Sequence, residues 1–176
     1  MAGINDFKSR LVGGGARANQ FRVLMNPPTG IAAPGLAVPE LTSFMVKASS
    51  LPGQTITEIP VNFRGRQLFV AGDRTFETWT TTIINDTDFR IRNGIEQWMS
   101  GINDLETSLG VSDMNAYTSD IIVQQLDRDD SVLKSYVLQT CWPTVLAPIE
   151  LSMDTVSEIE QFDVTWRYTS FSASGV

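Results

Sequence analysis

The chain has 176 residues, of which 42% are hydrophobic and 19% charged, and its 13 basic and 20 acidic side chains give a formal net charge of −7. These values predict one folded domain and exclude intrinsic disorder, as well as nucleic-acid binding through phosphates, which needs the opposite charge. With no histidine and one cysteine, the sequence also excludes Ser-His and Cys-His triads, an internal disulfide and CxxC metal sites.

The N-terminal segment has neither a secretory signal pattern nor an apolar run long enough to span a bilayer, so we expect no export signal and no membrane partner. The triplet Gly13–Gly15 has high backbone entropy, which predicts a flexible arm over residues 1–19 and a single β domain over residues 20–176. Residues 170–176 are small and polar, and we expect them to fray.

The first half of the domain predicts short strands joined by turns and loops. Four prolines and two glycines between residues 26 and 40 interrupt every period and predict a loop. Arg64–Gly65 predicts a hairpin turn, and Pro60 places its strand at a sheet edge or a bulge because proline cannot donate to a ladder. The predicted strands are Phe21–Met25, Leu41–Ala48, Thr55–Phe63, Arg66–Ala71 and Phe76–Ile84.

Apolar residues then recur at helical spacing, which predicts one amphipathic helix that ends near Gly101. We expect its start to be capped by Asp86, Thr87 or Asp88. The apolar stripe consists of Ile91, Ile95, Trp98 and Ile102.

The rest of the chain predicts strands again, over Asp120–Leu126 and Ser131–Trp142, with Asp127–Asp130 as the connecting turn. Phe162–Tyr168 alternates apolar and polar residues, which is typical of a half-buried antiparallel strand. About seven strands and one helix predict a mainly β fold, an antiparallel β-barrel or sandwich with the helix packed outside.

No residue receives a catalytic, cofactor-binding or metal-binding assignment, so we expect a protein that is not an enzyme and holds no cofactor. Asp127, Asp129 and Asp130 begin like a calcium loop, but Val132 and Leu138 stand where that loop needs glycine and glutamate. An enzyme with a carboxylate pair is disfavoured, because the sequence places no acid–base couple.

Two further features have simple structural interpretations. Cys141 lies within a predicted strand, and we expect a buried, unreactive thiol. Four tryptophans would suit a sugar-binding platform, but Trp98 and Trp166 lie on apolar stripes and are most simply core residues. The four tryptophans are Trp79, Trp98, Trp142 and Trp166.

An ordered set of motifs over residues 20–168 resembles the tail tube protein family of contractile-tailed bacteriophages, the gp19-like family of myophage tubes. The run Val70–Phe76 (Val-Ala-Gly-Asp-Arg-Thr-Phe) is the most specific of them. The others are Leu51–Gly53, Ile59–Val61, Trp79, Asn85–Asp86, a helix ending in Trp98, Trp142–Thr144 and Ile159–Thr165. The proline-rich segment over residues 26–40 and the glycine-rich arm depart from the family pattern.

The resemblance implies a β-barrel-like fold with a flanking helix and a structural role in the virion tail, assembled in the host cytoplasm. It implies that six copies form a ring and that rings stack into a hollow tube inside the sheath, through which double-stranded DNA passes without specific binding. The implied partners are further copies of the chain, the tail sheath protein, the baseplate tube initiator and the tail terminator. The implied inter-ring contact is the hairpin tip, Val61, Asn62, Phe63, Arg64, Gly65 and Arg66.

Six copies at −7 each would give a ring a formal charge of −42. We therefore expect some carboxylates to line the lumen and keep DNA from adhering, with Asp127, Asp129 and Asp130 as candidates. Like charges also oppose assembly, so neighbouring rings need complementary basic groups. The available ones are Arg64, Arg66, Arg74 and Arg90.

Two alternatives remain open from the sequence. One is the tube of a phage-like contractile particle, such as a tailocin or an injection system, or the tube-initiating protein of a baseplate. The other, from a different class, is a monomeric carbohydrate-binding β-sandwich that uses exposed tryptophans.

Overall fold

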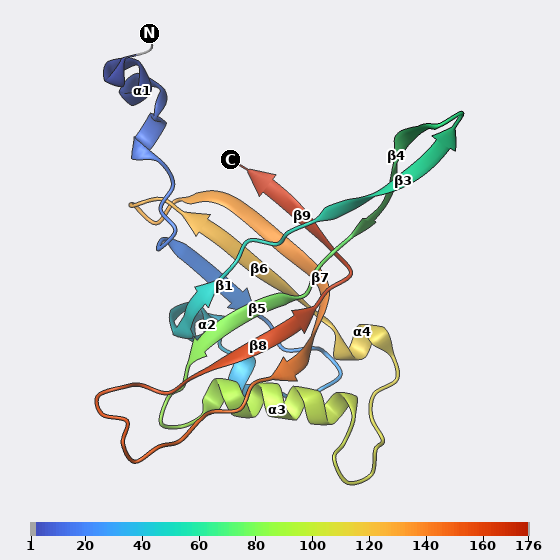
Figure 1. Ribbon diagram of the computed structural model, residues 1–176. Helices are drawn as coiled ribbons and strands as arrows, with labels where there is room; N and C mark the ends of the chain where they lie inside the picture. The colour runs from blue at the N-terminus through green and yellow to red at the C-terminus, as the bar shows by residue number, and fades with distance from the viewer. Residues whose placement is uncertain (1–2, 176) are drawn as a thin grey trace.

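A long bent strand, β7, joins two antiparallel sheets in the computed structural model, which describes residues 3–175 (Figure 1). The first part of β7 pairs with β6 and β9, and its last residues pair with β8. The path continues from β6 to β1 on one side and from β8 through β5 to β2 on the other. These strands are β1 (Phe21–Met25), β2 (Val46–Ser49), β5 (Trp79–Ile84), β6 (Ser119–Leu126), β7 (Val132–Leu146), β8 (Gln161–Arg167) and β9 (Ser170–Gly175). The predicted mainly β, antiparallel fold is confirmed.

The predicted helix is α3 (Arg90–Ile102), which lies across the lower end of the two sheets in Figure 1. It turns Ile91, Ile95 and Trp98 into the core, and the Trp98 and Trp166 rings lie 5.5 Å apart. Asp86, one of the predicted capping residues, accepts the Arg90 backbone N–H at 2.9 Å. The helical spacing of the sequence therefore identified this element and its buried face correctly.

Three tryptophans form the centre of the core, and each indole N–H has an acceptor. Trp79 donates to the Ser50 carbonyl at 2.7 Å, and Trp98 donates to the Tyr117 carbonyl at 2.6 Å. Trp166 donates to the Thr81 hydroxyl on β5 at 3.0 Å. Burying an indole without an acceptor costs free energy, so these contacts let the core hold its largest side chains.

The predicted strand over Leu41–Ala48 is wrong in its first part, because residues 39–45 form the helix α2 (Pro39–Met45). Pro39 occupies the first turn, where its fixed φ and missing N–H suit a helix. The buried Thr42 hydroxyl donates to the Pro39 carbonyl at 2.7 Å and accepts the Met25 N–H at 3.3 Å. These bonds fix the helical turn against β1, and the strand begins only at Val46.

The proline-rich segment before α2 is a loop, as predicted, and also contributes to the core. It contains a short 3-10 helix, η2 (Pro34–Leu36), whose Leu36 is fully buried. Gly35 packs so closely on α3 that a Cβ there would collide with the Arg90 carbonyl.

The prediction that residues 170–176 fray is wrong for residues 170–175, which form β9; residue 176 lies outside the described residues. β9 pairs with β7 from Gln139↔Ser170 to Lys134↔Gly175. Phe171 anchors it, since its ring lies 5.6 Å from that of Phe76. A further helix, α4 (Met114–Tyr117), precedes β6 and was not predicted.

Within the predicted N-terminal arm, the structure has a short helix, α1 (Ile4–Arg10), followed by a 3-10 turn, η1 (Val12–Gly14). None of the side chains of α1 is buried. Residues 1 and 2 lie outside the described residues, and the flexibility of the arm stays a prediction. In the described part of the chain, no helix has the length and apolar character needed to cross a membrane.

Candidate assembly interface

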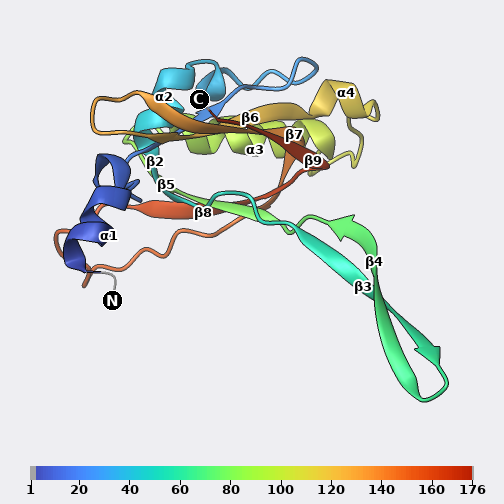
Figure 2. The ribbon, with the colours of Figure 1, turned by 90° about the horizontal axis from the view of Figure 1, so that it is seen from above.

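The hairpin of β3 (Thr55–Phe63) and β4 (Arg66–Thr75) projects far from the two sheets (Figures 1 and 2). All nine residues of β3 are exposed, and β4 is exposed except for the half-exposed Gly72. The strands pair from Thr55↔Thr75 to Phe63↔Arg66. In the described residues this ribbon has no third strand, so Pro60 sits at an edge as predicted.

The hairpin has one apolar face, which stays largely exposed in the described chain. Alternate residues of a strand share a face, and Ile59↔Val70 and Val61↔Leu68 are directly cross-strand pairs. We call this the apolar hairpin face; it consists of Ile59, Val61, Phe63, Leu68 and Val70, which are 45% to 67% exposed. The opposite face carries Asn62 and Gln67 as a cross-strand pair, together with Phe69. Such a surface indicates a contact with another molecule.

The predicted turn at Arg64–Gly65 is confirmed, with positive φ values of 47° and 81°. Two left-handed residues give the tight connection whose twist matches that of the strands. The Arg64 guanidinium lies 5.2 Å from the centre of the Phe63 ring. The structure thus brings the six predicted tip residues, Val61–Arg66, to the end of the projecting ribbon. Whether they contact a neighbouring ring stays a prediction.

The interface predicted from the sequence covers the tip alone, whereas the exposed apolar surface runs back along the ribbon to Ile59 and Val70. The signal was present in the alternation of Ile59, Val61 and Phe63. Alternation predicts the strand, but it does not say whether the apolar face is covered by the same chain.

The three candidate lumen carboxylates lie together in the β6–β7 turn. Asp127 Oδ1 accepts the Arg128 N–H at 2.8 Å, and Asp129 Oδ1 accepts the Ser131 hydroxyl at 2.6 Å and its N–H at 3.1 Å. These bonds to Ser131 hold the pKa of the Asp129 carboxyl below its usual value, so it keeps its negative charge. No cluster suited to a metal ion occurs in the part of the chain that the structure describes.

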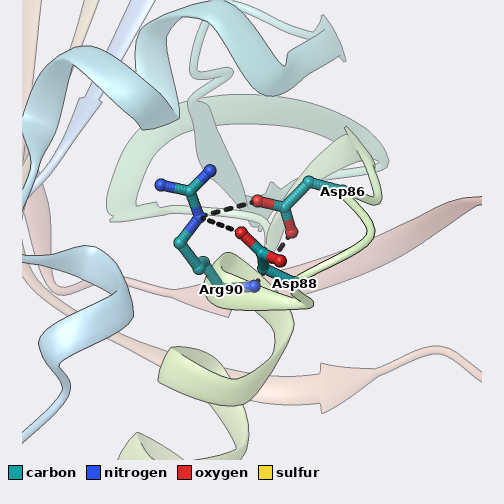
Figure 3. A network of polar contacts seen from close by, with 3 residues as sticks. All are labelled: Asp86, Asp88 and Arg90. Carbon is teal, nitrogen blue, oxygen red and sulfur yellow. Dashed lines mark hydrogen bonds and ion pairs between the residues drawn. The ribbon is translucent and has the colours of Figure 1, made fainter.

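Arg90, one of the four expected basic groups, is already neutralised within its own chain (Figure 3). Its Nε lies 3.0 Å from Asp86 Oδ2 and 3.6 Å from Asp88 Oδ2. This arrangement starts α3 after Phe89, which has a left-handed φ of 53°. Arg90 therefore pairs with carboxylates at the start of its own helix, and it is a weaker candidate for pairing between rings than Arg64 or Arg66.

The tryptophans do not form a sugar-binding platform. Trp79, Trp98 and Trp166 are at most 2% exposed, which confirms the core interpretation of Trp98 and Trp166. Only Trp142 among them is half-buried, at the surface beside α3. None of the four tryptophans, which all lie within the described residues, is exposed, and the carbohydrate-binding alternative depends on exposed tryptophans.

Comparison with known proteins gives matches over nearly the whole chain. The family model described as phage tail tube protein matches residues 16–174. The tail tube protein of Serratia phage KSP90 is 32% identical over 170 residues, which cover 96% of this chain and 95% of the relative. Tail tube protein gp19 of Enterobacteria phage T4 is 35% identical over 124 residues, or 70% of this chain and 76% of the relative.

Among solved structures, the tube-terminating cap of the anti-feeding prophage matches with a TM-score of 0.68 over 92% of both chains. Its sequence identity is 13%, so this likeness concerns the fold.

Proposed function

Because the chain belongs to the phage tail tube protein family, we propose that it is the subunit of the inner tube of a contractile phage tail. Six copies close into a ring, rings stack into a hollow tube, and the tube is the conduit through which double-stranded DNA leaves the capsid. The role is structural rather than enzymatic, and its site is the virion tail.

The observation that carries this proposal is the apolar hairpin face. A two-stranded ribbon is marginally stable alone in water, and here the side chains of its apolar face stay 45% to 67% exposed in the described chain. Packing against an adjacent subunit would cover that face and rigidify the ribbon. The ribbon projects well clear of the sheets, as contact with a neighbouring ring requires (Figure 2).

Free sheet edges support the closure of rings. Within the described residues, β1, β2 and β9 each pair on one side only. An exposed edge offers unpaired N–H and C=O groups, so strands of adjacent subunits can extend one sheet around a ring. A head-to-tail contact of this kind closes when its rotation divides a full turn.

The negative charge suits a conduit for DNA. A lumen lined by carboxylates repels phosphates, whereas cations would bind them and arrest the passage of DNA. Asp127, Asp129 and Asp130 are the candidates, and Asp129 keeps its charge to a lower pH than an ordinary carboxylate.

The partners of this function are the sheath that surrounds the tube, the initiator in the baseplate and the terminator at the head-proximal end, with assembly in the host cytoplasm. A tube of a phage-like injection system is the second candidate. The relatives at 32% and 35% identity are phage proteins, which favours the phage tail.

Negative-stain electron microscopy of the purified chain at low and high concentration tests the proposal. We expect six-fold rings with a central hole, and tubes at high concentration or after addition of preformed tube ends as seeds. Compact single particles under all of these conditions would contradict it, and a polysaccharide-retardation gel would then test the carbohydrate-binding alternative.

A further inference from the structure

An apolar groove lies beside the C-terminal end of α3, on a different part of the molecule from the hairpin. Its volume is about 430 Å³, and residues of α3, the following loop and the end of β7 line it. We call it the α3–β7 groove; its apolar lining includes Met99, Ile102, Leu105, Trp142 and Leu146. Leu105 is 93% exposed, so this surface is uncovered in the single chain.

The helix α1 carries an exposed apolar stripe that could fill such a groove. Ile4, Phe7 and Leu11 fall at i, i+3 and i+7 and are 72%, 63% and 44% exposed. A helix of this length is marginal in water by itself, so docking is what would stabilise it. At about 100° per residue, Lys8 and Arg10 flank the stripe on its two sides.

The charges of the two elements are complementary. Glu96 lines the groove, and Asp104 and Glu106 flank Leu105. Hydrogen bonds from Thr107 and from the Glu106 N–H lower the pKa of the Asp104 carboxyl, so it stays charged. The groove also lies at the C-terminus of α3, where the helix dipole favours cations. Glu96 is paired with Arg92 at 3.0 Å, which leaves Asp104 and Glu106 as partners for the basic residues of α1.

From this match we infer that α1 of one subunit docks into the α3–β7 groove of a second copy of the chain. Figure 1 places α1 and the C-terminal end of α3 at opposite ends of the molecule, so the helix does not occupy its own groove. The contact is therefore heterologous and repeats in one direction, as in an open stack. The inference rests on the proposed tube, and it supplies a second contact between copies, separate from the hairpin.

Cross-linking between two single-substitution variants tests the inference with the full chain. Leu11→Cys lies at the end of the α1 stripe and leaves Ile4 and Phe7 in place, and Asn103→Cys lies in the groove lining. Thr155→Cys, in the exposed β7–β8 loop, is the matched control for the groove position. The native Cys141 is buried and does not interfere. The variants are mixed before assembly and treated with a short bismaleimide.

We expect the L11C and N103C mixture to give at least tenfold more cross-linked dimer than the L11C and T155C mixture. Adding Phe7→Asp to the L11C chain should remove that excess, whereas Ser9→Asp, on the opposite side of α1, should leave it. Tubes that assemble with cross-linking no higher than in the control would overturn the docking inference and leave the tube function intact. Failure to form rings or tubes, together with control-level cross-linking, would overturn both.

Discussion

The Trp166 indole N–H donates to the Thr81 hydroxyl at 3.0 Å, and both residues are fully buried. Thr81 lies on β5 and Trp166 on β8, so this bond joins two strands in the centre of one sheet. The core around this bond is largely apolar, and in such a low-dielectric environment a polar group without a hydrogen-bond partner is costly.

Thr81→Val should therefore lower the free energy of unfolding by about 1–3 kcal/mol, because valine keeps the volume but leaves the indole N–H without an acceptor. Urea denaturation of the single subunit measures the change. Thr80→Val, at an exposed position of the same strand, is the control and should shift the stability by less than about 0.5 kcal/mol. Equal effects of the two substitutions would contradict the role given to this bond.

Cys141 shows how burial removes reactivity from the single thiol. Desolvation disfavours the thiolate and raises the pKa of Cys141 from 9.0 to about 12. The folded state therefore holds its proton more tightly than the unfolded state. Its contribution to stability is full below about pH 9 and is lost as the pH rises towards 12.

We expect iodoacetamide at pH 8 to alkylate the native protein at least about 100-fold more slowly than the urea-unfolded chain, because the thiolate is the reacting species. Mass spectrometry of timed samples measures both rates. Similar rates in the two states would show that the strand around Cys141 opens readily.

At the scale of elements, the β3–β4 hairpin has two chemically different faces at the same distance from the body. Val61 lies on the apolar hairpin face, and its neighbour Asn62 lies on the other face. Both are exposed in the single subunit, so a lysine at either position costs the folded monomer little.

Val61→Lys should abolish or strongly weaken tube formation, since it buries a charge in the proposed inter-ring contact, while the thermal midpoint of the subunit stays unchanged. Asn62→Lys adds the same charge one residue away and should leave assembly largely intact. Sedimentation velocity together with electron microscopy measures assembly. Equal assembly of both variants would mean that the apolar face is not the contact.

The elements that the sequence predicted correctly are those whose periodicity is local. The stripe of α3 and the alternation of β8 follow from spacing alone, and the Arg64–Gly65 turn follows from its residues. The strand predicted over Leu41–Ala48 begins only at Val46, because the Thr42 hydroxyl accepts the Met25 N–H of β1, a contact that local spacing does not reveal. β9 was missed for a similar reason, since pairing with β7 and the packing of Phe171 on Phe76 are contacts with distant parts of the chain.

At the scale of the whole molecule, part of the candidate site has a local sequence signal and part of it depends on long-range contacts. The hairpin tip was predictable from its motif, whereas the α3–β7 groove joins residues about 40 positions apart and has no local signal. The carboxylates of the β6–β7 turn were predicted as a cluster, but which surface of the assembled tube they face depends on how subunits pack together.

Changing Asp127, Asp129 and Asp130 to asparagine would reduce the formal net charge of each subunit from −7 to −4. If these groups line the lumen, tubes of this variant should retain double-stranded DNA in a low-salt filter assay, while unaltered tubes should not. The control variant removes three charges from the β7–β8 loop: Glu150→Gln, Asp154→Asn and Glu158→Gln. Equal DNA retention by both variants would mean that the charge of the β6–β7 turn is not specifically what keeps DNA from adhering.

The position of β8 has a consequence for biosynthesis. β8 is the strand that connects β5 to the end of β7, yet a ribosome makes it after both of them. A nascent chain that has already emerged through β7 therefore cannot close its second sheet, and its hairpin has no folded base from which to project. Until residues 161–167 have left the exit tunnel, β5 and the end of β7 lack their shared partner strand, so their unpaired edges are open to pairing with other chains.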